Sequence, residues 1–166
     1  MSAERIAARS LALVGTPSVT GDERAANDLV ASWLAPVADE IDQCVTPMAE
    51  LESDPAYPGR EMERDTVPVV GAKIAGNRPG PTLVLTGHVD AVPIGDESLW
   101  SRNPLGEVDG YLLYGRGAAD MKAGMVAAVE AFTTLANGDR DFAGEVRLVA
   151  VPGEEDGGTG TLAAIR

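Results

Sequence analysis

The chain has a single histidine, His88, which stands two positions before an acid, Asp90, in the stretch LTGHVDAVP (residues 85–93). The stretch continues an apolar run and ends at proline, a pattern that predicts a buried strand followed by a loop. Imidazole and carboxylate groups suit zinc, and a metal-binding imidazole usually gives its other ring N–H to a carboxylate. If residues 88 and 90 lie on the same face of the chain, Asp90 is well placed to orient His88.

Acidic residues also follow two later apolar segments. Asp120 comes after YLLYGRGAA (111–119), at the expected start of a helix, and Glu154 and Glu155 come after LVAVPG (148–153). Sites in open α/β sheets form beyond the carboxyl ends of strands, so these groups could meet in one crevice. The chemistry that this set favours is a hydrolytic metal site, in which one carboxylate can bridge two ions. Of two adjacent glutamates, one can bind metal while the other takes the proton from a metal-bound water.

Each cluster also has a structural interpretation. A histidine near an acid at a strand end often makes only a structural hydrogen bond, and the acids at 154–156 could form a solvated turn before a helix. The glycines of GRGAAD (115–120) could bind an anion or a nucleotide, but they lack G-x-G-x-x-G spacing, and no group of several basic residues accompanies them. Trp100 is interpreted as a loop anchor packed on the core, and Glu23 as an acid at a helix start. Taken together, the three clusters favour the metal site.

Composition narrows the class of protein. The 166 residues suggest one domain, and 45% hydrophobic and 23% charged residues are ordinary for a soluble globular protein. A formal net charge of −13 argues against nucleic acid or an anionic membrane as a partner. The one cysteine, Cys44, excludes an internal disulfide and a cysteine-built zinc site. Without a signal peptide or an apolar run of transmembrane length, we expect a cytoplasmic protein.

Helices that alternate with strands predict a layered α/β architecture. Residues 47–66 are rich in proline and charge and lack periodicity, so we expect a loop there. The continuous apolar run at 83–85 predicts a strand that is covered on both faces. The other expected elements are strands over 40–45, 67–76, 82–89, 111–115 and 145–153, and helices that end at Gly15, run from about Asp22 to Pro36, span 120–138 and begin at 158.

Four motifs occur in a characteristic order: GHVDAVP (87–93), W…NP (100–104), YGRGAADMKAG (114–124) and GEEDGGTGT (153–161). They resemble the zinc-dependent metallopeptidase and deacylase family that includes acetylornithine deacetylase, succinyl-diaminopimelate desuccinylase, carboxypeptidase G and aminoacylase. TPSVTGDE (16–23) is similar to the opening motif of that family. The resemblance spans nearly the whole chain and is strongest to the acetylornithine deacetylase/succinyl-diaminopimelate desuccinylase branch. It implies a three-layer α/β/α fold with a mixed, mostly parallel central sheet.

The resemblance also implies roles for the site residues. His88 would bind one metal ion and Glu155 the other, Asp120 would bridge both, Asp90 would orient His88, and Glu154 would be the general base and acid. The implied cofactor is Zn²⁺, two ions per complete site, with Co²⁺ or Mn²⁺ as alternatives. The implied reaction is hydrolysis of an N-acyl or peptide amide bond in a small substrate, such as an N-acyl amino acid or a peptide.

Members of the family supply a further carboxylate ligand and a second histidine downstream, together with an inserted dimerisation domain. This sequence ends at Arg166 with one histidine. We therefore expect residues 1–166 to be the N-terminal part of a catalytic domain, truncated before the dimerisation domain, with a homodimer for the full-length protein. The alternative is a catalytically incomplete fragment that acts at most as a binding or assembly module. The resemblance also implies a cis peptide bond between Asp120 and Met121.

Overall fold

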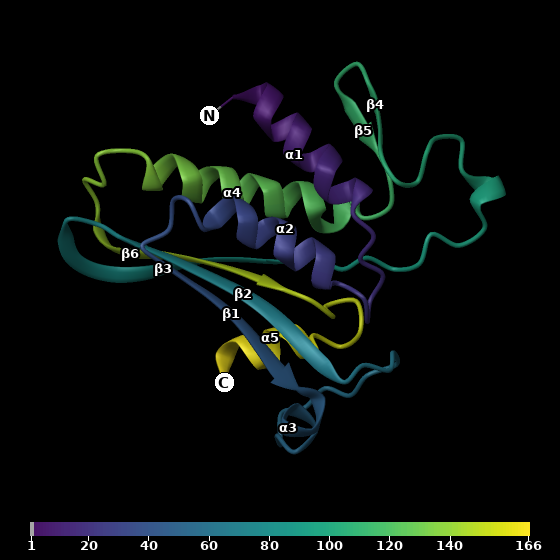
Figure 1. The fold of residues 1–166 in the computed structure, drawn as a ribbon, viewed down its shortest axis with the longest axis horizontal. Helices are drawn as coiled ribbons and strands as arrows, with labels where there is room; N and C mark the ends of the chain where they lie inside the picture. Colours follow the sequence, from purple (N-terminus) through teal and green to yellow (C-terminus); the bar gives the residue numbers. More distant parts are fainter. Residues whose placement is uncertain (1) are drawn as a thin grey trace.

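The computed structural model describes residues 2–166, and its centre is a four-stranded sheet with the order β1-β2-β6-β3 (Figure 1). The strands are β1 (Glu40–Pro47), β2 (Thr66–Ala75), β3 (Arg78–His88) and β6 (Ala143–Val151). β6 runs parallel to β3 and antiparallel to β2, and β2 runs antiparallel to β1. The sheet is mixed, as the resemblance implies.

Among the three pairings of the described four-stranded sheet, only β3–β6 is parallel, so the expectation of a mostly parallel sheet is not met within these four strands. A strand that returns parallel to its neighbour needs a long crossover connection. Between β3 and β6 that crossover contains α4 (Ala123–Ala136). β1 and β2, in contrast, are joined by a connection that reverses the chain, so they pair antiparallel.

Helices cover both faces of the sheet and give three layers (Figure 1). α2 (Arg24–Leu34) and α4 pack on one face, and α1 (Ala3–Gly15) packs on α4. α5 (Thr159–Ile165) lies on the opposite face and contacts β2 and β6. With few aromatic residues, aliphatic side chains fill most of the core between sheet and helices, and its fully buried members include Leu13, Val30, Leu34, Ile74, Met125, Val129, Phe132 and Leu148.

Two segments differ from the sequence prediction. Residues 47–66, expected to be a loop, contain the short helix α3 (Met48–Glu52). Its two buried residues, Met48 and Leu51, lie one turn apart in a small apolar cluster with residues of β2 and α5, a contact that a five-residue pattern cannot reveal. The predicted strand at 111–115 forms as β5 (Leu112–Tyr114), but it pairs with β4 (Glu107–Asp109) in a separate hairpin rather than with the main sheet.

The apolar run in the middle of β3 is exposed, contrary to the prediction that both its faces are covered. Leu83 is 55% exposed and Val84 is 52% exposed. β3 is the edge strand of the described sheet, with β6 as its neighbour, and only its C-terminal part is buried. A continuous apolar run therefore marked a strand correctly, whereas the coverage of that strand depends on segments that the run does not encode.

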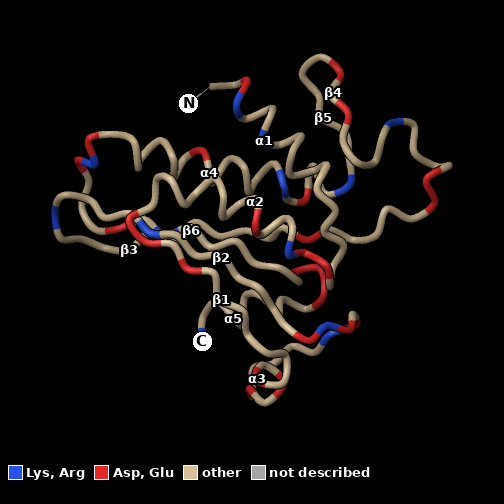
Figure 2. The backbone as a smooth tube through the Cα atoms, viewed as in Figure 1, with Lys and Arg blue, Asp and Glu red and all other residues tan. Residues whose placement is uncertain are grey.

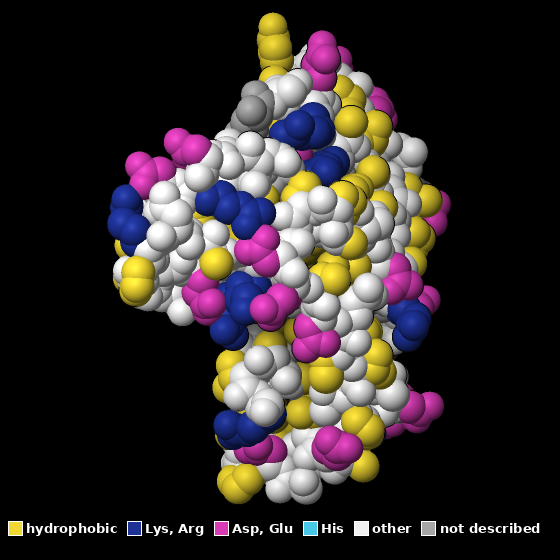
Figure 3. All heavy atoms as spheres, turned by 60° about the vertical axis from the view of Figure 1, so that its left-hand side comes forward, with side chains coloured by type: hydrophobic (Ala, Val, Ile, Leu, Met, Phe, Trp, Pro, Cys, Tyr) yellow, Lys and Arg dark blue, Asp and Glu magenta, His cyan; other side chains and the backbone are white. Residues whose placement is uncertain are grey.

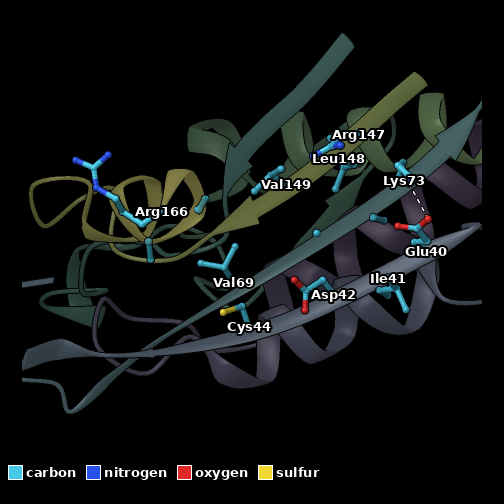
Figure 4. A pocket seen from close by; sticks show the side chains of 14 residues that line it. Glu40, Ile41, Asp42, Cys44, Val69, Lys73, Arg147, Leu148, Val149 and Arg166 are labelled. Carbon is cyan, nitrogen blue, oxygen red and sulfur yellow. Dashed lines mark ion pairs between the residues drawn. The ribbon is translucent and has the colours of Figure 1, made fainter. Parts of the chain in front are cut away.

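The face of the sheet that carries α5 is only partly covered. A groove of about 670 Å³ lies beside α5, over β1, β2 and β6. Figure 4 shows Ile41, Val69 and Val149 along this groove, with the ion pair between Glu40 and Lys73 at one end (Oε1–Nζ 2.7 Å). The lining of this groove does not include the carboxyl ends of β3 and β6, at which the sequence places the site.

On the face shown in Figure 3, basic side chains do not form a continuous positive patch. There, basic side chains lie beside acidic ones, and acids outnumber bases 26 to 13 along the chain. Nucleic acids and anionic membranes attract proteins through concentrated positive charge, which this face lacks. Within the described residues, moreover, none of the helices combines the length and the apolar character that a bilayer crossing requires.

The contrast between buried and exposed valines on neighbouring strands gives a stability prediction. Val146 on β6 is 4% exposed, whereas Val84 on β3 is 52% exposed. Val146→Ala should lower the free energy of unfolding by about 1.5–3 kcal/mol, because it removes buried methyl groups and leaves a cavity. Val84→Ala should change it by less than about 0.5 kcal/mol. Urea unfolding followed by circular dichroism measures both, and equal losses would contradict the observed coverage of β3.

Candidate metal centre

The parallel pairing of β3 and β6 brings two of the sequence clusters together. His88 is in register with Val151, and the N–H of Val89 donates to the carbonyl oxygen of Val151 (3.0 Å). Because both strands end at the same edge of the sheet, Asp90 lies directly beside the acidic turn that follows β6. Figure 2 shows acidic segments gathered at this end of the central strands.

The carboxylate of Asp90 is fully buried at this edge and holds the acidic turn in place. Its oxygens accept hydrogen bonds from the backbone N–H groups of Glu154 (3.2 Å) and Glu155 (3.1 Å) and from the hydroxyl of Thr20 (3.2 Å). Burial alone would raise the pKa of Asp90, but hydrogen bonds from His88 and from the two backbone amides lower it below its usual value. Asp90 is therefore ionised and acts as a clamp between the two strand ends.

His88 is buried between Asp90 and Asp120. Its Nδ1 lies 3.1 Å from the backbone oxygen of Asp90 and 3.4 Å from the Oδ1 of the same residue. Its Nε2 lies 3.1 Å from the Oδ1 of Asp120. Burial favours the neutral ring, but the hydrogen bonds and charges of Asp90 and Asp120 outweigh it and raise the pKa of His88 to about 9. The Nδ1 side is thus fixed by Asp90, and Nε2 faces Asp120.

Asp120 reaches His88 from a different direction. The predicted helix begins at Asp120, but α4 begins at Ala123, and residues 118–122 form a distorted turn before it. Within this turn Asp120 is extended (φ −124°, ψ 102°), and the peptide bond between Asp120 and Met121 is cis, as the resemblance implies. The sequence clusters therefore meet as two strand ends of one sheet and a turn that lies outside it.

Three of the predicted site residues could hold a metal ion. His88, Asp120 and Glu155 each offer one ligand atom, and these atoms lie within 4.8 Å of one another. Two ligands of one tetrahedral zinc lie about 3.4 Å apart, close to the Nε2–Oδ1 separation of 3.1 Å between His88 and Asp120. Burial and the neighbouring carboxylates raise the pKa of Glu155 above its usual value. An imidazole with two carboxylates, crowded by like charge, fits a divalent cation.

The fourth predicted ligand-type residue, Glu154, lies at the edge of this group. Its Oε2 is 3.8 Å from the Nε2 of His88, and its side chain is about half exposed (54%). Asp90 is fully buried, and its carboxylate contacts the backbone of the turn and, within this group, the Nδ1 of His88 (3.4 Å). The structure thus separates the five predicted residues into three that cluster, one beside the cluster and one beneath it.

Residues 16–23, the N-terminal motif, contact segments that carry the site residues. The resemblance to the family assigned no role to this motif. Val19 forms an isolated parallel bridge with Ala91, next to Asp90. The buried Lys122 donates from Nζ to the backbone oxygen of Thr16 (2.8 Å), and burial lowers its pKa to about 8. The motif therefore anchors the N-terminal segment against the loop after β3 and against the turn before α4.

A buried ion pair behind the acidic turn was missed by the sequence analysis. Arg64 Nη2 lies 2.7 Å from the Oε1 of Glu23, and both side chains are almost completely buried. A Cβ placed on Gly153, where φ is +66°, would lie only 3.1 Å from Nη1 of Arg64. Glu23 does precede α2, but its carboxylate points inward to Arg64 and to the N–H of Gly21 (2.8 Å). No local pattern signals a pair whose members are 41 residues apart.

Comparison with known proteins identifies the family. Residues 84–166, half of the chain, match the model of Peptidase family M20/M25/M40. The matched residues contain all five predicted site residues. The chain belongs to this family.

Relatives in sequence agree with this assignment, and solved structures share the fold. A succinyl-diaminopimelate desuccinylase of Methylobacterium radiotolerans is 41% identical over 87% of this chain, which spans 33% of that relative. Human carnosine dipeptidase 1 has a similar fold, with a TM-score of 0.70 at 19% identity over 98% of this chain and 34% of its own. The Bacillus subtilis YXEP protein, described as a dinuclear metal binding peptidase, gives a TM-score of 0.60 at 18% identity over 98% and 39%. The chain thus spans about a third of the length of the curated relatives it matches.

The environment of His88 gives a prediction for the metal-free protein. Because its pKa in the folded state is about 9, above the 6.5 of a free histidine, the charged ring stabilises the fold below pH 6.5. That stabilisation is lost as the pH rises from 6.5 through 9. NMR titration of the single imidazole should give a midpoint near 9, and Asp90→Asn should lower it while the protein stays folded. A wild-type midpoint at or below 6.5 would contradict the observed contacts.

The buried pair of Arg64 and Glu23 gives a second prediction. Arg64→Met should lower the free energy of unfolding by about 3–5 kcal/mol, because it leaves the carboxylate of Glu23 buried without its cation. The double change Arg64→Met with Glu23→Gln should cost less than the sum of the single changes. Urea unfolding of the four proteins measures this coupling. Additive effects would show that the two side chains do not interact.

Proposed function

We propose that this chain belongs to a metal-dependent hydrolase that cleaves an N-acyl or peptide amide bond. The observation that carries the proposal is the convergence of His88, Asp120 and Glu155, with ligand atoms within 4.8 Å of one another. Family membership supports a hydrolase of the peptidase and deacylase type. The desuccinylase relatives, 30–41% identical, support a deacylase that acts on an N-acyl amino acid.

We assign the metal ligands from the donor atoms. His88 and Asp120 would hold one divalent ion, and Asp120 and Glu155 would hold a second. Zn²⁺ is the proposed ion, with Co²⁺ or Mn²⁺ as alternatives, because imidazole and carboxylate ligands accept all three. When bound, such ions lower the pKa of a water molecule and polarise the carbonyl group of the substrate. The Bacillus subtilis YXEP protein, which has a similar fold, is described as a dinuclear metal binding peptidase, and this supports two ions in the proposed centre.

Glu154 is the proposed general base and acid. Its carboxylate is about half exposed and lies 3.8 Å from His88, so it reaches the space in front of the ligand group. From there it could accept a proton from the attacking water and pass it to the departing amine. Asp90 is the proposed positioning residue, because it holds the ring of His88 and the backbone of residues 154 and 155 without facing the substrate.

The described residues support a second reading of this chain on its own. His88, Asp120 and Glu155 are fewer ligands than two four-coordinate ions require. The 166 residues would then bind metal weakly and act at most as a binding or assembly module. The homodimer of the full-length protein and its cytoplasmic location stay predictions. They rest on the resemblance and, for location, on the lack of a long apolar segment.

Metal binding and hydrolysis test the proposed roles separately. We expect zinc binding by this chain, measured by calorimetry, to be lost in His88→Asn and kept in Glu154→Gln. We expect hydrolysis of an N-succinyl amino acid by the zinc-loaded protein to fall about 10²–10⁴-fold in Glu154→Gln, because the proton acceptor is removed. Glu50→Gln, an exposed residue of α3, is the matched control. Undiminished hydrolysis in Glu154→Gln would exclude Glu154 as the base, and zinc binding unchanged in His88→Asn would exclude the proposed centre.

A further inference from the structure

Arg116 stands apart from the other basic side chains of residues 2–166. Every other lysine and arginine pairs with an acid, except Lys122, which donates to a backbone oxygen. Within the described chain, the guanidinium of Arg116 has neither an ion pair nor a hydrogen bond, and its Nε is buried. Acids outnumber bases twofold here, 26 to 13, so an arginine without an acid is not explained by a shortage of acids.

The guanidinium is nevertheless held in a defined place. Arg116 lies over the ring of Trp100, with 5.1 Å between Cζ and the ring centroid. Trp100 is itself fixed, because its indole N–H donates to the backbone oxygen of Ile94 (3.0 Å). Stacking on an aromatic ring orients an arginine but satisfies none of its N–H donors, which lie in the plane of the guanidinium. Since Nε is enclosed, a ligand would reach Arg116 through its two Nη atoms.

Arg116 and Trp100 line a hollow of about 780 Å³ that reaches the turn before α4. One wall is the projecting loop that follows β3, at the right of Figure 1, and another is β5. Ala118 and Ala119 also line the hollow and directly precede Asp120. A group bound beside Arg116 would therefore lie next to the turn that carries the proposed bridging ligand.

The other charged groups of the hollow are already satisfied. Asp96 accepts hydrogen bonds from the N–H (2.9 Å) and hydroxyl (2.7 Å) of Ser98. Arg102 pairs through its two Nη atoms with Glu107 (2.6 Å) and Asp109 (2.7 Å). Arg116 is thus the one charged group of the hollow whose donors have no acceptor within the described residues.

We propose that this hollow is a carboxylate subsite in which Arg116, held over Trp100, binds a carboxylate of the substrate. A guanidinium offers two parallel N–H donors to a carboxylate, a stronger and more directional contact than neutral hydrogen bonds. We place that carboxylate on the acyl group of the substrate, at the end away from the amide bond that is cleaved. This placement rests on the proposed function. The subsite would select acyl groups derived from dicarboxylic acids over uncharged acyl groups of the same length.

The binding test uses the metal-free chain, because a carboxylate could otherwise bind to zinc. Succinate is titrated, and the indole N–H signal of Trp100 and the Nε–H signal of Arg116 are followed by NMR. The indole signal of Trp33 serves as an internal reference. Succinamide, which has the same length without charge, is the control ligand. We expect a saturable shift of the Trp100 and Arg116 signals with succinate and none with succinamide.

Variants assign the binding to Arg116. Arg116→Met should weaken succinate binding about tenfold or more, as expected for the loss of a charged hydrogen-bonding partner. Arg24→Met makes the same change in net charge at an exposed side chain of α2 and should leave the affinity within about twofold. No saturable shift up to about 50 mM succinate in the folded protein would overturn the proposal. Equal binding by Arg116→Met, or by succinamide, would overturn it as well.

The outcome is independent of the proposed metal centre. Zinc binding by the same chain is measured separately and should be unchanged in Arg116→Met. Succinate binding at Arg116 without zinc binding would sustain the subsite and contradict the metal centre. Zinc binding without succinate binding would sustain the metal centre and contradict the subsite.

Discussion

The buried carboxylate of Asp90 is the interaction on which the arrangement of the site depends. It accepts hydrogen bonds from the backbone of two residues that follow β6 and lies against the histidine that ends β3. Because an ionised carboxylate is costly to bury, it persists only where several donors surround it. Here the donors come from three separate parts of the chain, so the position of Asp90 requires all three to be in place. The charge that is expensive to bury is thus what holds the strand ends in one geometry.

This constraint links the topology of the sheet to its chemistry. β3 and β6 must be parallel for their carboxyl ends to meet, and the crossover between them carries the turn with Asp120. A single topological unit therefore delivers the imidazole, the carboxylate of Asp120 and the pair of glutamates. The buried pair of Arg64 and Glu23 backs the acidic turn from the other side, and Lys122 ties the N-terminal segment to the turn before α4. Buried charged side chains thus hold in place the segments that carry the exposed groups of the centre.

The clusters that form the site could be found from the sequence because their chemistry is local. His88 with Asp90, and the adjacent Glu154 and Glu155, are recognisable from residue type and from the strands before them. The pair of Glu23 and Arg64 could not be found in this way, since its members lie far apart and each has an ordinary local explanation. The same limit applies to Arg116, whose lack of an acidic partner is visible only when every other basic side chain has been placed.

The fold shows the same division. The positions of strands and helices could be predicted from the periodicity of apolar residues. Which strands are covered by other elements could not be predicted in this way. The run that contains Leu83 and Val84 was correctly identified as a strand, but it lies at an edge of the described sheet. Likewise β5 formed where its apolar residues indicated, but its partner is β4 rather than the main sheet. Both differences concern the neighbours of a strand, which the alternation of residues within that strand does not specify.

The most direct test of this account is the position of zinc in crystals of the protein, located by anomalous diffraction at the zinc absorption edge. We predict an ion about 2.0–2.2 Å from the Nε2 of His88 and from a carboxylate oxygen of Asp120, with Asp90 hydrogen-bonded behind the ring. An ion bound directly by Asp90, or zinc found only at other acidic side chains of the surface, would contradict it.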